Sequence, residues 1–222
     1  MSTPLADTSG PAGFHLRPYT NADLDGLLAI QRACFPPPFP PELWWQPGQI
    51  AAHVRLFPAG ALCAVADVDD TLIGSATAHC ITFDPAHPAH TWAQVSADGW
   101  LTNHEPRGDT LYGVDVAVHP HWRGRGVARA FYHARFALVR HLGLKRFLCG
   151  SRLSGYHLHA DRLSPEDYAA AVVAGQLNDP VVSPQLKAGL RPVTVVRGYL
   201  PDAESRDNAL LMAWDNPDLI AP

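Results

Sequence analysis

The sequence has no apolar run near the roughly 20 residues that a membrane-spanning helix needs, and residues 1–13 lack the basic start and apolar stretch of a secretion signal. We therefore expect a soluble, cytoplasmic protein with no membrane partner. The few cysteines form no C-x-x-C pair, which argues against a zinc knuckle or a dense disulfide framework. Reduced thiols, mostly in the core, are expected at Cys34, Cys63, Cys80 and Cys149.

Acidic residues are absent between positions 116 and 160, although the whole chain has 21 acidic and 17 basic side chains and a net charge of −4. This stretch is either a solvated helix face or a site for a small anion. Duplex nucleic acid is not expected as a partner, because the isoelectric point of about 6.3 is far from that of such binders. The basic residues of the stretch are Arg123, Arg125, Arg129, Arg135, Arg140, Lys145, Arg146 and Arg152.

The length of 222 residues and the composition, 47% apolar and 17% charged, are typical of a globular chain of one large or two small domains. Residues 1–13 are small, polar and rich in glycine and proline, so we predict a flexible lead-in there. We interpret residues 14–222 as one domain with an inserted helical segment at about 151–184.

Hydrophobic periodicity and capping signals predict alternating strands and helices. Thr20 to Asp23 has the form of a helix N-cap box, and the prolines at 36–38 and 40–41 must end the helix that follows. Strands are expected at 14–17, 61–67, 71–83, 110–118, 146–150, 191–200 and 209–214, and helices at 21–34, 42–56, 126–142 and 164–175. This order predicts an α/β (α+β) fold with mixed strand directions.

The most informative segment is 116–128, where a strand ends, a proline marks a turn, and Gly124 and Gly126 precede an amphipathic helix. Glycine lets the backbone approach a ligand, and the first amides of a helix have no partner within it. With the positive end of the helix dipole and two flanking arginines, they form a phosphate site. Neither the dinucleotide-binding G-x-G-x-x-G nor the Walker pattern fits, because Arg129 replaces the third glycine and no Gly-Lys-Ser/Thr follows.

The string V-x-P-x-x-R-G-x-G at residues 118–126 resembles motif A of the GCN5-related N-acetyltransferases, the GNAT superfamily. The run from Lys187 to Leu190 looks like the family's entry into its sixth strand. A G-Y-H segment at Gly155 to His157 is similar to that of the acetyltransferase-like modules found beside carbon–nitrogen hydrolases. The resemblance covers most of residues 14–215 and is strongest at 111–150.

The resemblance implies a GNAT-like single domain: a mixed, mostly antiparallel central sheet with helices on both faces and a splayed strand pair. It also implies an N-acetyltransferase that takes acetyl-CoA, or another acyl-CoA, and transfers the acyl group to a small-molecule or peptide amine by direct attack. A catalytically inactive acyl-CoA-binding or sensor module is the alternative, and a homodimer is left open. The residues implied in cofactor binding are Val116, Ala117, Val118, Arg123, Gly124, Arg125, Gly126, Val127 and Ala128.

The acid–base residues are less clearly marked. Asp115 lies in the strand beside the expected thioester, as a general base or as an acid that only binds a neighbouring backbone group. Where the family often has a tyrosine that protonates the leaving thiolate, this sequence has Gln185. Tyr156 or His157, or else Tyr168, could take over that role from the inserted segment, and each also has a structural interpretation.

Two further groups have alternative interpretations. His119 with His121, and the residues at 157, 159 and 161, are spaced like metal ligands on a strand, but 12 histidines produce such pairs by chance and we expect no metal. The aromatic cluster Phe35, Phe39, Trp44 and Trp45 is either ordinary packing or the lining of an acceptor pocket. In the second case the amine would have an apolar or aromatic portion.

Overall fold

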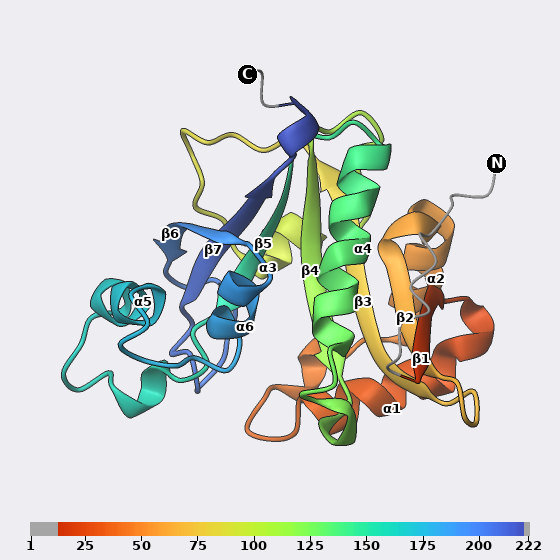
Figure 1. Ribbon diagram of the computed structural model, residues 1–222, viewed down its shortest axis with the longest axis horizontal. Coiled ribbons are helices and arrows are strands. Elements are labelled where there is room, and N and C mark those ends of the chain that lie inside the picture. The colour runs from red at the N-terminus through yellow and green to blue at the C-terminus, as the bar shows by residue number, and fades with distance from the viewer. Residues whose placement is uncertain (1–12, 220–222) are drawn as a thin grey trace.

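A single seven-stranded sheet, in the order β1-β2-β3-β4-β5-β7-β6, runs through the computed structural model, which describes residues 13–219 (Figure 1). Only β4 and β5 are parallel neighbours; the other pairs are antiparallel, which confirms the predicted mixed sheet. The strands are β1 (Phe14–Pro18), β2 (Ala61–Ala66), β3 (Leu72–Ile81), β4 (Thr110–Val118), β5 (Arg146–Arg152), β6 (Arg191–Val196) and β7 (Ala209–Asp215).

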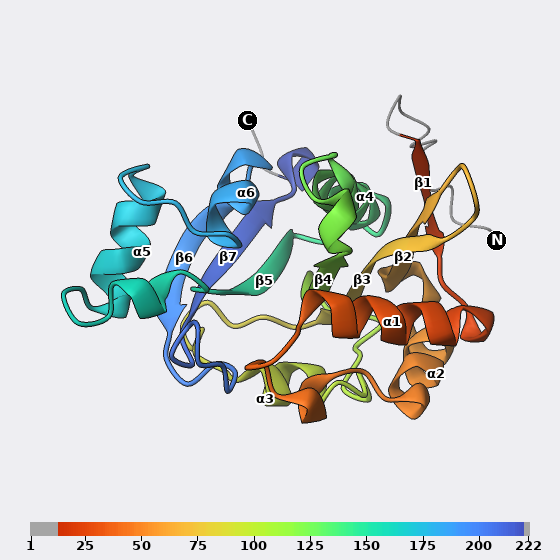
Figure 2. The same cartoon turned by 90° about the horizontal axis from the view of Figure 1, so that it is seen from below.

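Helices cover both faces of the sheet, as predicted (Figure 2). One face carries α1 (Leu24–Cys34), α2 (Pro47–Leu56) and α3 (Trp92–Ser96), and the other carries α4 (Val127–His141), α5 (Pro165–Val173) and α6 (Val182–Lys187). Leu27 and Ile50 are buried on the first face, and Phe131 and Val172 on the second. Apolar side chains buried from both sides stabilise the sheet in the middle layer.

Capping residues and prolines set where the first two helices begin and end. Thr20 and Asp23 form the predicted capping box, and α1 ends at Cys34, before the prolines. The predicted helix at 42–56 begins later than expected, at Pro47. Gln46 is extended, because the residue before a proline avoids helical geometry, and the proline then occupies the first helical turn.

The parallel pair β4 and β5 separates part-way along its length. Their pairing runs from Thr110 opposite Arg146 to Gly113 opposite Cys149, whereas β4 continues to Val118. On its other side β4 has a bulge against β3, because Thr77 lies opposite Asp115 while the next residue of β3 lies opposite Gly113. The result is the expected splayed pair, with an irregular β4 at the point where the strands diverge.

The four cysteines are free thiols and three of them are buried. The segment between β5 and β6 contains α5 at the position of the helix expected at 164–175, and also α6, which the sequence pattern does not predict. The treatment of this segment as an insertion stays a prediction. The flexible lead-in at 1–13 lies, apart from Gly13, outside the described residues. Among residues 13–219 no helix combines the length and apolar character needed to cross a bilayer.

Two fully buried histidines make stability depend on pH. Burial lowers the pKa of His53 and His79 to about 4, so both are neutral in the folded protein at pH 7. An unfolded histidine binds a proton near pH 6.5, so stability is fully present above that pH and is lost as the pH falls towards 4. We expect the melting temperature to drop between pH 7 and pH 4.5, and to drop less in His79→Phe.

The control for this prediction is His121→Phe, because His121 is exposed and its replacement should leave the pH dependence unchanged. Equal pH dependence of melting in His79→Phe and the unmodified protein would contradict the assignment of a neutral, buried His79.

Candidate active site

A cavity of about 1270 Å³ opens where β4 and β5 diverge. Its walls come from elements that are far apart in the sequence: the end of α1, the proline-rich segment after it, β4, the first turn of α4, β5 and α6. The phosphate-type loop and the candidate base Asp115 both line this one cavity. The fold therefore brings the two sequence-predicted parts of the site together.

The loop between β4 and α4 presents free amide groups. Gly124 and Gly126 have φ of 75° and 87°, in the left-handed region that other residues disfavour, and nothing lies within 4 Å of the position of an added Cβ. Within residues 13–219, the amides of residues 124–129 donate no hydrogen bond. Because the loop is exposed and opens a helix of 15 residues, these amides can bind an anion.

The eight basic residues of the acid-free stretch differ in their surroundings: three lie near the loop, four form ion pairs elsewhere, and Arg135 is buried. Near the loop, Arg123, Arg125 and Arg129 are exposed and have no acidic partner in the described part of the chain. Arg125 stacks on Trp122 at 4.9 Å. Away from the loop, the ion pairs are Arg140 with Asp218, Lys145 with Asp109, Arg146 with Asp215 and Arg152 with Asp202.

The end of β4 has an open edge towards the cavity. Val116, Ala117 and Val118 pair with β3 on one side, but β5 no longer pairs with them on the other. All three line the cavity. A strand edge of this kind can hydrogen-bond an extended chain that contains amides.

Asp115 is half-buried at the β4 bulge and faces the cavity. Its carboxylate accepts hydrogen bonds from the Thr77 amide at 3.0 Å and from Nε2 of Gln31 at 3.2 Å. Burial raises the pKa of Asp115 to about 6, against the opposing effects of Arg135 and Thr77. A carboxyl group with this pKa is ionised at pH 7 and is a better proton acceptor than an ordinary aspartate.

The other acid–base candidates are held by backbone groups. Tyr156 is buried, and its hydroxyl donates to the Leu163 carbonyl at 3.0 Å. His157 lines the cavity, but its Nδ1 contacts the carbonyls of Ser154 and Glu204 at 3.0 and 3.1 Å. Tyr156 is not part of the cavity lining, so only His157 of these two can reach a bound molecule without rearrangement.

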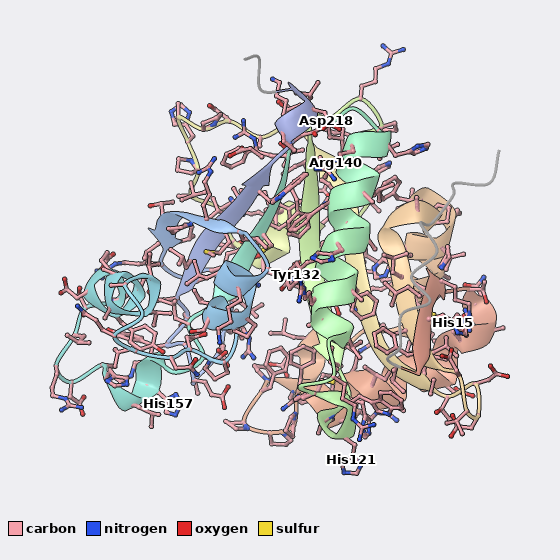
Figure 3. The ribbon with its side chains drawn as sticks, viewed as in Figure 1. His15, His121, Tyr132, Arg140, His157 and Asp218 are labelled. Atoms are coloured by element: carbon pink, nitrogen blue, oxygen red, sulfur yellow. The ribbon has the colours of Figure 1, made fainter. Side chains whose placement is uncertain are left out.

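Gln185, which stands at the family's tyrosine position, is buried against a hydroxyl from another element. Its Nε2 donates to Oη of Tyr132 at 2.8 Å. Tyr132 belongs to α4 and lies on the side of that helix towards β5 and α6 (Figure 3). His157 lies farther away, in the short turn between β5 and α5. Tyr132 lines the cavity and supplies a hydroxyl that the sequence did not single out.

Three of the four clustered aromatic residues line the cavity: Phe35, Phe39 and Trp45. Trp44 does not, and its indole nitrogen donates to the Phe35 carbonyl at 2.9 Å. The guanidinium of Arg152 lies over the rings of Phe35 and Phe39 at 5.8 and 5.3 Å. These contacts favour the second interpretation of the cluster, an apolar wall of the cavity.

The sequence did not indicate Gln31, Thr77 or Arg135 as site residues. Gln31 was visible as a polar residue on the apolar side of its helix, and it is 3% exposed in the structure. Arg135 belongs to the basic stretch, but its side chain is buried and does not face solvent. Their convergence on Asp115 depends on the packing of α1, β3 and α4 around one bulge.

The sequence profile of the acetyltransferase (GNAT) family matches residues 24–159, more than half of the chain. The chain belongs to the GNAT family. It is 43% identical over 201 residues to the uncharacterized N-acetyltransferase YkwB of Bacillus subtilis, with 90% of this chain and 88% of that protein covered. This GNAT chain is accordingly an N-acetyltransferase by family and by that relative.

Two further comparisons concern the extent of the GNAT domain and its fold. The probable hydrolase YhcX of Bacillus subtilis is 35% identical over 206 residues, 92% of this chain but 39% of that longer protein. The structure of the GNAT-like decarboxylase GphF with isobutyryl-CoA superposes with a TM-score of 0.75 at 22% identity, over 91% of this chain and 99% of that one. The latter similarity shows the shared fold.

The GNAT cavity fits an acyl-CoA. The free amides of residues 124–129 and the exposed arginines suit a diphosphate, and the open β4 edge suits the amides of a pantetheine arm. Bound there, an acyl-CoA would supply an activated thioester. Within residues 13–219, no cluster of three or more histidine, cysteine, aspartate or glutamate side chains is arranged to hold a metal ion.

Proposed function

We propose that this GNAT protein transfers acetyl from acetyl-CoA to a small-molecule or peptide amine that has an apolar or aromatic portion, with Asp115 as the general base. The observation that carries the proposal is the position of Asp115: a carboxylate with a pKa of about 6 in the same cavity as the free loop amides. A cytoplasmic location and a homodimer stay predictions.

The loop and the open strand edge hold the two ends of the cosubstrate arm. Amides of Arg125, Gly126, Val127 and Ala128 would bind the diphosphate, with the charges of Arg123 and Arg125 beside them. Backbone groups of Val116, Ala117 and Val118 would pair with the pantetheine amides. The thioester then lies near the bulge, where a backbone amide can stabilise the developing oxyanion.

The acceptor amine enters along the aromatic wall formed by Phe35, Phe39 and Trp45. Asp115 takes a proton from the ammonium form, and the neutral amine attacks the carbonyl carbon. The new C–N bond forms as the C–S bond breaks, the nitrogen loses its second proton, and the leaving thiolate takes up one proton, so the reaction releases one proton overall, the one accepted by Asp115. Tyr132 is a hydroxyl on the cavity wall that can provide the proton for the thiolate, with Gln185 in contact with it.

Two observations favour the alternative, an inactive acyl-CoA-binding module. Gln185 replaces the family's tyrosine, and the hydroxyl of Tyr156 is already bonded to a backbone carbonyl. A module of this kind would bind acyl-CoA as tightly as the enzyme and would release no thiol.

Thiol release from acetyl-CoA, measured with a panel of aromatic, aliphatic and peptide amines, tests the proposal. We expect release that depends on the amine, saturates with it, and is fastest for amines with an aromatic or apolar portion, because the acceptor wall is aromatic. Calorimetric titration with CoA is run in parallel. Tight CoA binding without release for any amine would contradict the proposed transfer and favour the inactive module.

A further inference from the structure

Arg135 is a buried cation directly beneath the β4 bulge. It extends from α4 and is 1% exposed. Its Nη2 donates to the carbonyl of Thr77 at 2.8 Å and to the carbonyl of Asp115 at 2.5 Å. These are the two residues that face each other across the bulge, so one guanidinium nitrogen joins β3 to β4 at this irregular point.

No acidic side chain in the described ranges forms an ion pair with Arg135. Its Nε has no hydrogen-bond partner, and its guanidinium lies 5.4 Å from the ring centre of Phe147. Burying a cation in this way is unfavourable unless its charge is balanced nearby. The carboxylate of Asp115 is the acid whose charge interacts with it, without direct contact.

We propose that Arg135 is a positioning residue for acyl transfer, which acts through Asp115 by fixing the bulge that turns the carboxylate into the cavity and by keeping that carboxylate ionised. This inference rests on the proposed function, in which Asp115 is the base. When cosubstrate and amine fill the cavity and exclude water, the carboxylate loses solvation. A fixed positive charge beneath the strand is not displaced by the substrates and opposes that loss.

The surroundings of Asp115 single out Arg135 as the source of this charge. Gln31 and Cys34 of α1, Thr77 of β3, Trp45 and Tyr19 are the other groups that interact with the carboxyl group. Burial raises the pKa of Cys34 to about 11 and raises that of Tyr19 further, so both are neutral at pH 7. Arg135 is therefore the one group in this set that is positively charged there.

The pH dependence of kcat/KM for Arg135→Gln and Arg135→Lys tests the inference. The glutamine keeps a donor for one carbonyl but removes the charge, so we expect the acid limb of the pH–rate profile to move up by about one pH unit. That shift alone lowers the ionised fraction of Asp115 at pH 7 about twofold, and the lost bridge between the two carbonyls should lower the rate severalfold further. The lysine keeps the charge without bridging both carbonyls. Its acid limb should stay within about half a unit of that of the unmodified protein, while its rate falls severalfold.

The control is Arg140→Gln, on the same helix, whose side chain pairs with Asp218 away from the cavity at the other end of α4 (Figure 3). This substitution should change neither kcat/KM nor the position of the acid limb of its pH profile. In the Asp115→Asn background, Arg135→Gln should cause little further loss, because both substitutions remove the function of one carboxylate. Full additivity of the two losses would contradict action through Asp115.

A folded Arg135→Gln protein with an unmoved acid limb would overturn the inference. Should that variant fail to fold, Arg135→Lys tests the inference instead. An unchanged kcat/KM at every pH in Arg135→Lys would show that the hydrogen bonds from Arg135 to the Thr77 and Asp115 carbonyls are not needed, and would overturn the inference. The Asp115→Asn profile separates this failure from a failure of the proposed function. An acid limb that survives in Asp115→Asn rejects Asp115 as the base, whereas a limb that disappears there and stays fixed in Arg135→Gln rejects only the role of Arg135.

Discussion

Replacing Gly126 with valine is expected to weaken CoA binding at least about 30-fold, roughly 2 kcal/mol, while the fold is retained. The φ of Gly126 is 87°, a conformation that strains a β-branched residue, so the loop must change shape. The added side chain also projects from the loop whose free amides would bind the diphosphate. Loss of one or two charge-assisted hydrogen bonds gives an effect of this size. Calorimetric titration with CoA measures it.

Gly143→Val is the matched control. Gly143 follows the other end of α4, has a φ of 64° and likewise has no atom within 4 Å of an added Cβ. The substitution therefore introduces similar strain outside the cavity lining. We expect a comparable change in melting temperature for the two variants but a loss of CoA affinity only for Gly126→Val. Equal CoA affinity in both would place the diphosphate elsewhere.

Replacing Asp115 with asparagine is expected to lower kcat/KM by about 10²- to 10³-fold above pH 6, the range typical of losing a general base. Because the pKa of Asp115 is about 6, the unmodified protein should show an acid limb near that pH. Below pH 6 the carboxyl group is protonated in the unmodified protein as well, so the difference between the two narrows. The variant should have no such limb. Measurement of kcat/KM from pH 5 to pH 9 gives both profiles.

Asp115→Asn should not lose stability at neutral pH. The folded pKa is raised above the ordinary value of 3.8, so the folded protein binds the proton more tightly and the group disfavours folding as the pH rises from about 4 to 6 and beyond. Asparagine removes this penalty, and the melting temperature at pH 7.5 should be equal or higher. The control is Asp109→Asn, which should leave kcat/KM unchanged, because Asp109 immediately precedes β4 and pairs with Lys145. An unaltered pH profile of kcat/KM in Asp115→Asn would show that Asp115 is not the general base and has only a structural role.

The parts of the fold that could be predicted are those determined by residues that are close together in the sequence. The capping box at Thr20, the glycines before α4 and the hairpin of β2 and β3 depend on local geometry, and the structure confirms them. The late start of α2 does not follow from helical spacing, because the residues at 42–46 allow a helix; Pro47 keeps Gln46 extended, so the helix begins only at the proline.

The site itself was only half predictable. The loop from Arg123 to Ala128 is contiguous, so its residue types and spacing indicate an anion site directly. The setting of Asp115 combines Gln31, Thr77 and Arg135 from three elements, and no local pattern reports which side chains meet at a bulge. Arg135 was especially hard to identify, because an arginine in a basic stretch is ordinarily solvated, and only the packing of α4 on the sheet buries it.

The most direct test of this account is a crystal structure of the protein with CoA. We predict the diphosphate within hydrogen-bond distance of amides in residues 125–128, the pantetheine along Val116 to Val118, and the sulfur beside the β4 bulge near Asp115. A diphosphate bound away from that loop, with the amides of residues 124–129 still unoccupied, would contradict the central claim.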